Sequence, residues 1–199
     1  MKKYTVTWGW QPPQYDRPKG NFRLFFHTEE VEREVTHKDF ETGEETTEII
    51  HEWLCDVVEY DKSEAAEILR LIKEGKNSVE CKRWILKERI KAYDKSRHVE
   101  DFTIGEVHLW LDSHMRAKVR EALETSKIRG EEYTTLRFNG MEFTMKTEDG
   151  WKMYFAVLGY ARASWDNTQS HLAMVDKLET VEDIDNYDYM SGYPKKLTF

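Results

Sequence analysis

The fold of this chain is decided by Thr134–Lys146, which reads TTLRFNGMEFTMK. Asn139-Gly140 at its centre is a strong signal for a two-residue hairpin turn, because both turn positions need a positive φ. A turn there predicts that Phe138 pairs with Met141, Leu136 with Phe143, Thr134 with Met145, Arg137 with Glu142 and Thr135 with Thr144. The first three pairs form a mainly apolar face and the last two a polar face. Turn, register and charge therefore agree on a hairpin that packs by one side.

A long helix is expected directly after this hairpin, from Glu148 to about Leu178, with Thr147 as its cap. Apolar residues recur at helical spacing and predict one buried stripe, formed by Tyr154, Leu158, Ala161, Trp165, Thr168, Leu172 and Val175. Near the start of the helix, Trp151, Phe155 and Val157 widen the stripe, so this half is expected to be deeply buried. Before the hairpin, the pattern predicts a strand at Glu106–Leu111 and a helix that is capped by Asp112 or Ser113 and ends at Gly130. After the long helix we expect a short helix from Thr180, an aromatic turn and a last strand at Leu197–Phe199.

The N-terminal half reads as a β-ribbon followed by two helices. Asn21–His37 and Thr46–Tyr60 have the alternation of strands, and Gln11–Gly20, with three prolines, is expected to be a loop. In the first strand, Val31, Arg33 and Val35 alternate with Glu30, Glu32 and Glu34, which predicts one solvent-exposed (wet) face. A capping box at Asp61-Lys62-Ser63-Glu64 should start the first helix, with a stripe that includes Leu69, and Gly75 should end it. Asn77 or Ser78 should cap the second helix.

These elements predict an α+β protein: an N-terminal antiparallel β-ribbon with two helices, then a β-hairpin packed on a long C-terminal helix. The polar stretch Ser96–Asp101 is the best candidate for a domain boundary. We therefore expect one domain over residues 1–100 and a second over residues 101–199. The 7 Trp, 10 Tyr and 9 Phe provide enough large apolar side chains to form a core.

Charge is unevenly distributed along the chain. Residues 28–64 contain 14 acidic and 3 basic side chains, a balance of −11, whereas residues 82–97 contain 7 basic and 2 acidic ones, a balance of +5. The two segments are either solvated faces or complementary patches that meet between molecules. A net charge of −8 argues against a nucleic-acid partner.

The location of the protein is predicted from what the sequence does not contain. No apolar run reaches the ~20 residues of a membrane span, so no membrane partner is expected. The N-terminus has no apolar signal-peptide core, which predicts the cytoplasm of the producing cell. Cys55 and Cys81 are then expected to be reduced thiols.

No combination of residues predicts a reaction, so we expect no enzyme, no catalytic residue, no cofactor and no metal. His51-Glu52-Trp53-Leu54-Cys55 resembles a zinc-protease motif only in part, because its second histidine is replaced and its alternation is that of a strand. His98, Glu100, Asp101, His108, Asp112 and His114 crowd one region, and His171 lies near the stripe of the long helix. Hydrogen-bonding histidines and a capping Asp112 account for these residues without chemistry. Trp8, Trp10 and Tyr15 either pack on the ribbon or form a candidate interface.

The residues from about Glu106 to Phe199 resemble a phage and prophage family known as domain of unknown function 4376. The resemblance is carried by Leu109-Trp110-Leu111-Asp112, Thr134–Thr144, Asn167–Leu172, Tyr187-Asp188-Tyr189 and Gly192–Phe199. It implies a tail-associated or prophage-encoded protein, for which the family provides no assigned enzymatic activity and no catalytic residues.

Three functions follow as expectations. The first is a non-enzymatic structural or assembly protein of a phage or prophage tail, which contacts other phage or prophage proteins, forms a homo-oligomer and is carried in the virion. The second is a small-ligand-binding module or enzyme that uses the His98–His114 region or His171. The third is a peptide-binding adaptor that uses Trp8, Trp10 and Tyr15.

Overall fold

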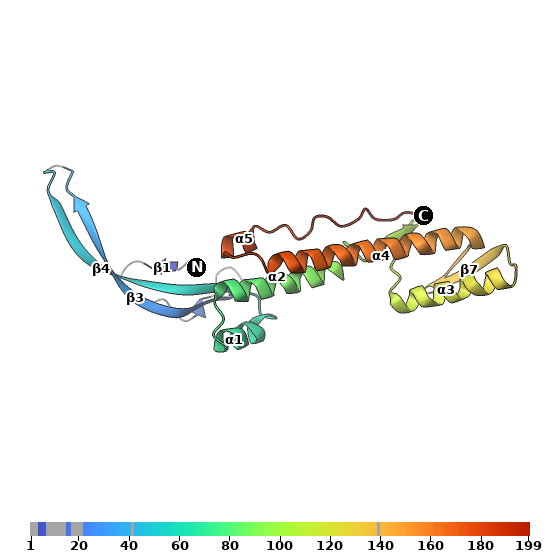
Figure 1. The fold of residues 1–199 in the computed structure, drawn as a ribbon, viewed down its shortest axis with the longest axis horizontal. Helices are drawn as coiled ribbons and strands as arrows, with labels where there is room; N and C mark the ends of the chain where they lie inside the picture. The colour runs from blue at the N-terminus through green and yellow to red at the C-terminus, as the bar shows by residue number, and fades with distance from the viewer. Residues whose placement is uncertain (1–3, 7–14, 17–21, 41, 139) are drawn as a thin grey trace. The chain divides into compact units, whose positions relative to one another are not determined.

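The computed structural model describes residues 4–6, 15–16, 22–40, 42–138 and 140–199 (Figure 1). The described chain is α+β, with five helices and three antiparallel sheets, so the predicted fold class is confirmed. It divides into two compact units, Met1–Glu88 with Met174–Tyr187 and Arg89–Ala173 with Asp188–Phe199. The division into folding domains at residue 100 stays a prediction.

The first unit contains a four-stranded antiparallel sheet in the order β1-β4-β3-β2. Its strands are β1 (Tyr4–Val6), β2 (Tyr15–Asp16), β3 (Phe22–Lys38) and β4 (Glu45–Tyr60). The two long strands confirm the predicted ribbon. β2 corrects the prediction of a continuous loop over Gln11–Gly20: Tyr15 pairs with Leu24, and Asp16 with Arg23. A strand of two residues is too short to show the alternation by which strands are identified in a sequence.

A β-bulge divides the β3–β4 ribbon into two parts. Phe26 pairs with Asp56, but the next pair is Glu29 with Leu54, and His27 has a φ of +50°. A slip of one residue moves the following side chains to the other face of the sheet. The glutamates of β3 at positions 30, 32 and 34 would otherwise continue the face on which Leu24 and Phe26 are buried.

Beyond the bulge, the ribbon continues as an arm, which we define as residues 31–52 (Figure 1). The described parts of β1 and β2 pair only with residues 53–55 of β4 and 23–24 of β3, so neither covers the arm. The sequence predicted one wet face, but the register places Glu34 beside Ile49 and Val35 beside Glu48. Each face therefore mixes acidic and apolar side chains, and Ile49 is 59% exposed.

Helices α1 (Ala65–Lys73), α2 (Ser78–Asp94) and α5 (Val181–Asp185) complete the first unit, with α2 contributing up to Glu88. The reciprocal contacts of Asp61 with Glu64 and of Asn77 with Glu80 confirm the two predicted helix starts. Leu71 is buried in α1, while Leu69, predicted for the stripe, is 44% exposed. The core of this unit consists of Leu24, Phe26, Val58, Tyr60, Ile68, Leu71, Cys81 and Ile85.

The basic segment of α2 is largely used within the first unit. Lys82 lies 2.8 Å from Asp185, and Arg83 donates to the carbonyl oxygen of Leu178 at 2.7 Å. Lys87 pairs with Asp176 at 2.5 Å. These contacts join α2 to the returning C-terminal segment. They give the positive charges partners inside the molecule, which weakens the idea that this segment is a free patch for the acidic ribbon of another copy.

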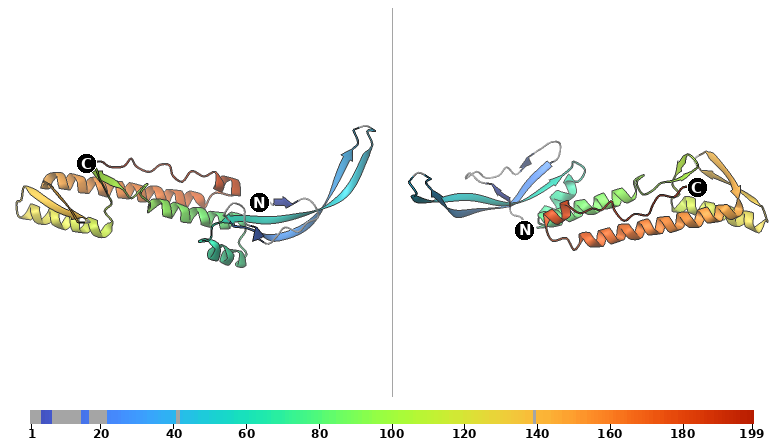
Figure 2. Two further views of the ribbon diagram at one scale, coloured as in Figure 1. Left: turned by 180° about the vertical axis from the view of Figure 1, so that it is seen from behind. Right: turned by 90° about the horizontal axis from the view of Figure 1, so that it is seen from above.

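The second unit is formed by β5 (Phe102–Ile104), β6 (Val107–Leu109), α3 (Ser113–Ile128), β7 (Tyr133–Phe138), β8 (Met141–Lys146) and α4 (Thr147–Val175), the last continuing to Ala173 within the unit. β7 and β8 have the predicted register at every pair, and Gly140 has a φ of +81°. Asn139 lies outside the described residues. α3 and this hairpin lie beside the first half of α4 (Figure 2). Their core includes Phe102, Leu111, Val119, Leu123, Leu136, Phe138, Met153 and Val157.

The predicted strand at Glu106–Leu111 corresponds to the shorter β6, which forms a hairpin with β5 through Gly105, at a φ of +59°. The Phe102–Ile104 strand was not predicted. The C-terminus adds one parallel bridge between Thr198 and Thr103, and the Gly105 N–H donates to the Phe199 carbonyl at 2.9 Å. The predicted final strand is therefore a single bridge rather than a regular strand.

The buried line of α4 differs from the predicted stripe. Trp165 is 57% exposed and Phe155 is 61% exposed, although both were expected to be buried. The buried side consists of Gly150, Met153, Tyr154, Val157, Tyr160, Ser164, Thr168, His171 and Val175. Tyr154, Thr168 and Val175 of the predicted stripe are on this side. Ser164 and His171 were not expected in it, because a search for apolar periodicity passes over polar residues.

Candidate functional site

The candidate interface residues lie mainly outside the described part of the chain. Trp8 and Trp10 are not among the described residues. The backbone of Tyr15 belongs to β2 and pairs with Leu24. A peptide-binding or interface role for these three residues therefore stays a prediction.

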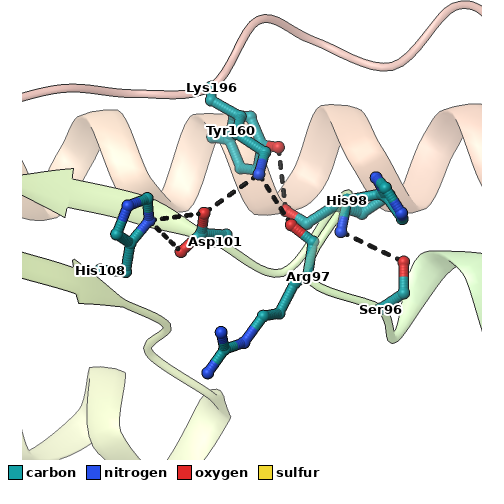
Figure 3. Close-up of polar contacts among 8 residues, drawn as sticks. Ser96, Arg97, His98, Asp101, His108, Tyr160 and Lys196 are labelled. Atoms are coloured by element: carbon teal, nitrogen blue, oxygen red, sulfur yellow. Dashed lines mark hydrogen bonds and ion pairs between the residues drawn. The ribbon is translucent and has the colours of Figure 1, made fainter.

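The region from His98 to His114 contains a polar cluster centred on Asp101, which is 7% exposed (Figure 3). The Asp101 carboxylate lies 3.0 Å from His108 Nδ1 and accepts a hydrogen bond from Lys196 Nζ at 3.0 Å. Lys196 also donates to the Arg97 carbonyl at 2.8 Å, and the Tyr160 hydroxyl donates to the Val99 carbonyl at 2.9 Å. The cluster ties the C-terminal segment and α4 to the loop before β5, which is a structural task.

The electrostatics of this cluster favour an ionised Asp101. Burial acts to raise the pKa of Asp101, but hydrogen bonds from Lys196 and His108 outweigh it, so the pKa is lowered. A lowered pKa in the folded state means that Asp101 stabilises the fold when ionised. That contribution is complete above the pKa of the unfolded chain, about 3.9, and is lost as pH falls through the lower pKa of the folded state.

Asp101→Asn is therefore expected to lower the free energy of unfolding at neutral pH by about 1–3 kcal/mol, because Lys196 loses its charged acceptor. The difference from the unaltered protein should shrink as pH falls below about 4. Urea unfolding followed by circular dichroism over a pH series measures it. Asp149→Asn, at an exposed ion pair with Lys152, is the control and should change stability by less than about 1 kcal/mol. A deficit for Asp101→Asn that persists unchanged in acid would contradict this account.

The other histidines do not converge with His108. His98 stacks on Tyr93, with ring centroids 5.4 Å apart, and His114 is exposed in the first turn of α3. His171 Nε2 lies 3.0 Å from the Ser191 carbonyl oxygen, and its ring stacks on Tyr193. These contacts agree with hydrogen-bonding and packing roles and do not form an acid–base pair.

The same region borders a cavity of about 690 Å³ within the second unit, between the end of α2, the start of α3 and the middle of α4. This volume is in the range of small-molecule sites. None of the histidines lines it. Its walls include Glu100, Trp110, Arg116, Arg162, Ser164 and Trp165. The predicted region from His98 to His114 therefore borders a cavity, but the residues of this region that line it are not its histidines.

Glu100 and Arg116 are two charged side chains that line this cavity. Burial, and then the neighbouring Asp94, raise the pKa of Glu100, while Trp110 and Arg116 beside it act in the opposite direction. The Arg116 guanidinium lies 6.0 Å from the centroid of the Trp110 ring, within the reach of a cation–π contact. Arg116 Nη1 also donates a hydrogen bond to the Leu111 carbonyl oxygen at 2.6 Å, which fixes the position of the guanidinium.

The cysteines are unsuited to nucleophilic chemistry. Both are buried free thiols. Burial raises the pKa of Cys81 to about 12, and burial together with Asp56 raises the pKa of Cys55. A thiol with a raised pKa has little thiolate at neutral pH. The partial zinc motif that ends at Cys55 lies on β4, the strand in which it was predicted. Its Glu52 is buried, and Glu52 Oε1 lies 3.3 Å from Arg33 Nη2.

Among the described residues, no group of three or more His, Cys, Asp or Glu side chains is arranged to hold a metal ion. In the same residues, no helix has both the length and the apolar character needed to cross a membrane. Comparison of the chain with protein-family models, with curated proteins and with solved structures found no match. The fold and the side-chain geometry are therefore the basis of the functional argument.

The residues of the cavity were only partly found from sequence. Glu100 and Asp112 were noted, but Trp165 was placed in the core and Ser164 was not considered. The cavity itself requires three elements to meet and has no local signature.

Proposed function

We propose that this protein is a non-enzymatic structural or assembly protein of a phage or prophage tail, and that its arm is the part that binds other phage or prophage proteins. The arm is the observation that carries this proposal. It extends from β3 and β4 past the described parts of β1 and β2, which pair only next to the core. A two-stranded ribbon with no buried apolar face is only marginally stable alone, so we infer that a binding partner stabilises the arm.

The charge of the arm favours a basic partner. Residues 31–52 contain 8 acidic and 2 basic side chains, a balance of −6. Several of the acidic side chains form exposed cross-strand pairs, such as Glu48 with His37 and Glu45 with Lys38. Exposed pairs of this kind contribute little to stability, so the charge is better explained by steering a partner and by preventing stray strand pairing.

The tip of the arm adds an apolar anchor. Phe40 is fully exposed, at 105% of the reference accessibility, in the turn that joins β3 to β4. Large aromatic side chains at the centre of an interface account for much of the binding energy. We infer a partner with a basic surface around an apolar recess that receives Phe40.

Deletion of the arm tests this proposal. Replacing residues 34–49 by Asn-Gly leaves the Arg33 and Ile50 pair closed by a two-residue turn. The core of the first unit lies on the other side of the bulge, so the thermal melting curve should change little. Binding to the products of the neighbouring genes, measured by co-expression and co-purification followed by calorimetry, should weaken by at least about tenfold.

Phe40→Ser provides a smaller change at the same place, and Glu121→Lys, on the exposed side of α3, is a charge control that should retain binding. Binding to one neighbour that weakens with salt and requires Phe40 supports the proposal. A protein that remains monomeric in light scattering and binds no neighbouring gene product would refute it. Binding that the arm deletion leaves unchanged would refute the role of the arm.

A further inference from the structure

The β7–β8 hairpin of the second unit has an open edge. β7 and β8 form a sheet of two strands, and α3 lies beside β7. The outer edge of β8 pairs with no strand of the described chain. An unpaired edge is a template for the addition of another strand, and proteins commonly protect it with a proline, a bulge or a covering element. β8 reads MEFTMK, contains no proline, and has an unbroken register with β7.

The hydrogen bonds of the hairpin show which backbone groups face this edge. The Thr147 N–H donates to the Glu132 carbonyl oxygen at 2.9 Å, so these two positions continue the ladder as a hydrogen-bonded pair. In an antiparallel ladder such pairs alternate with pairs that do not bond. Counting back by two, the N–H groups of Glu142, Thr144 and Lys146 point away from β7. In the described part of the chain, none of these three N–H groups has an acceptor.

The inward face of the hairpin is less covered at β8 than at β7. The inward side chains of β7 are buried, whereas those of β8, which are Met141, Phe143 and Met145, are only half-buried. A strand added to the outer edge of β8 would extend this face and remove more of its apolar area from water. Removal of apolar area from water favours association.

The sequence of β8 is complementary to itself in an antiparallel alignment. When Thr144 lies opposite Thr144 of a second copy, Glu142 of each copy lies opposite Lys146 of the other. Phe143 then lies opposite Met145. Opposite charges and apolar pairs across neighbouring strands stabilise a sheet. A shift of two residues in either direction loses both charge pairs, so the sequence favours this one register.

The charged side chains of this alignment can accept a further partner. Lys146 forms no ion pair with any described residue. Glu142 Oε1 lies 2.6 Å from Arg137 Nε in its own hairpin, but both side chains are largely exposed. A carboxylate has a second oxygen with its own lone pairs, so Glu142 can accept from Lys146 of a second copy while it keeps Arg137.

We propose that a second copy of this chain binds at the outer edge of β8, so that the two hairpins form one four-stranded antiparallel sheet with two-fold symmetry. The Thr144 N–H of each copy donates to the Thr144 carbonyl of the other, and the Lys146 N–H donates to the Glu142 carbonyl. Symmetry provides every contact twice. The dimer uses the second unit, whereas the arm belongs to the first. Dimerisation therefore does not depend on the proposed assembly function, and either can fail alone.

Sedimentation equilibrium of the full chain tests the proposal. Strands of six residues form a small interface, so we expect a reversible dimer with a Kd of about 10–100 μM. Lys146→Glu places two glutamates opposite each other, and Glu142→Lys places two lysines opposite each other. Each variant alone should therefore dimerise about tenfold more weakly. An equimolar mixture of the two, with one of them fluorescently labelled, should form a heterodimer, because every glutamate then lies opposite a lysine.

Thr144→Pro tests the backbone contact. Its N–H points away from β7, so a proline leaves the hairpin ladder intact and removes the central donor of the dimer. This variant should remain folded by circular dichroism and should be monomeric. Glu121→Lys makes the same charge change as Glu142→Lys on the exposed side of α3 and should dimerise normally. Deletion of the arm should also leave the dimer unchanged.

Three outcomes would overturn the proposal. The first is a protein that is monomeric up to about 500 μM, well above the expected Kd. The second is a Thr144→Pro variant that dimerises like the unaltered protein, which would place the contact elsewhere. The third is a mixture of the Lys146→Glu and Glu142→Lys variants that associates no better than either variant alone, which would exclude this register.

Discussion

Phe102→Ala is expected to lower the free energy of unfolding by about 3–5 kcal/mol, the usual range for removing a buried phenylalanine. Phe102 is 1% exposed and is the largest of the fully buried side chains. Its ring packs edge-on against Phe199, with centroids 5.9 Å apart. The substitution removes apolar area and leaves a cavity between β5, the C-terminus and the rest of this core. Urea unfolding followed by circular dichroism measures the loss.

Trp165→Ala is the matched control for this prediction. Trp165 is the larger side chain, but it is 57% exposed, so its removal should change the free energy of unfolding by less than about 1 kcal/mol. Sequence periodicity alone would rank the two substitutions in the opposite order. Equal losses for the two variants, or a larger loss for Trp165→Ala, would contradict the described core.

Gly150→Val is expected to destabilise the protein by about 2–3 kcal/mol, in the upper part of the range for overpacked cores. A Cβ atom at Gly150 would lie 2.6 Å from Leu123 Cδ2 and 3.5 Å from Met145 Sδ. Leu123 is completely buried, so it has little room to move. Valine adds two further methyl groups to this contact. The measurement is the same urea titration.

Gly159→Val tests the same substitution in the same helix without the clash. No atom lies within 4 Å of a Cβ built at Gly159, and the residue is exposed. The small difference in helix propensity between glycine and valine predicts a change within about 0.5 kcal/mol. Similar effects at both glycines would show that helix propensity, rather than the close approach of α3 and α4, determines the result.

The local elements of the fold were predictable because their signals lie within a few residues. Asn139-Gly140 determined the register of β7 and β8, and Asp112 starts α3 by accepting from the Met115 N–H at 2.7 Å. The short helix α5 begins at the predicted Thr180, whose hydroxyl accepts from the Asp183 N–H. Turn and cap chemistry acts over three or four residues, so the sequence alone contains it.

Apolar periodicity predicted only part of the buried side of α4. It included Thr168, whose hydroxyl lies 2.8 Å from both the Asp94 carboxylate and the Tyr193 hydroxyl, but it passed over His171, whose Nε2 lies 3.0 Å from the Ser191 carbonyl oxygen. These partners are distant in sequence. A polar residue becomes a core residue when the fold provides its hydrogen bonds, and only the assembled structure shows that it does.

The candidate sites could be predicted only in part from the sequence. The sequence indicated the acidic ribbon, and the resemblance supplied the assembly hypothesis. The bulge at His27 then determined which side chains share a face of the arm, because a slip of one residue exchanges the two faces. The cavity beside Trp165 requires α2, α3 and α4 to meet, so no window of sequence could reveal it.

The sequence by itself determined the α+β class, both long ribbon strands, the hairpin register and the starts of most helices, since each depends on short-range steric and hydrogen-bonding preferences. Only the tertiary structure decided that Trp165 faces solvent while Ser164 faces inward, and that the basic segment of α2 has partners within its own unit. The physical reason is that burial and long-range pairing depend on which distant surfaces meet, and periodicity along the chain does not specify them.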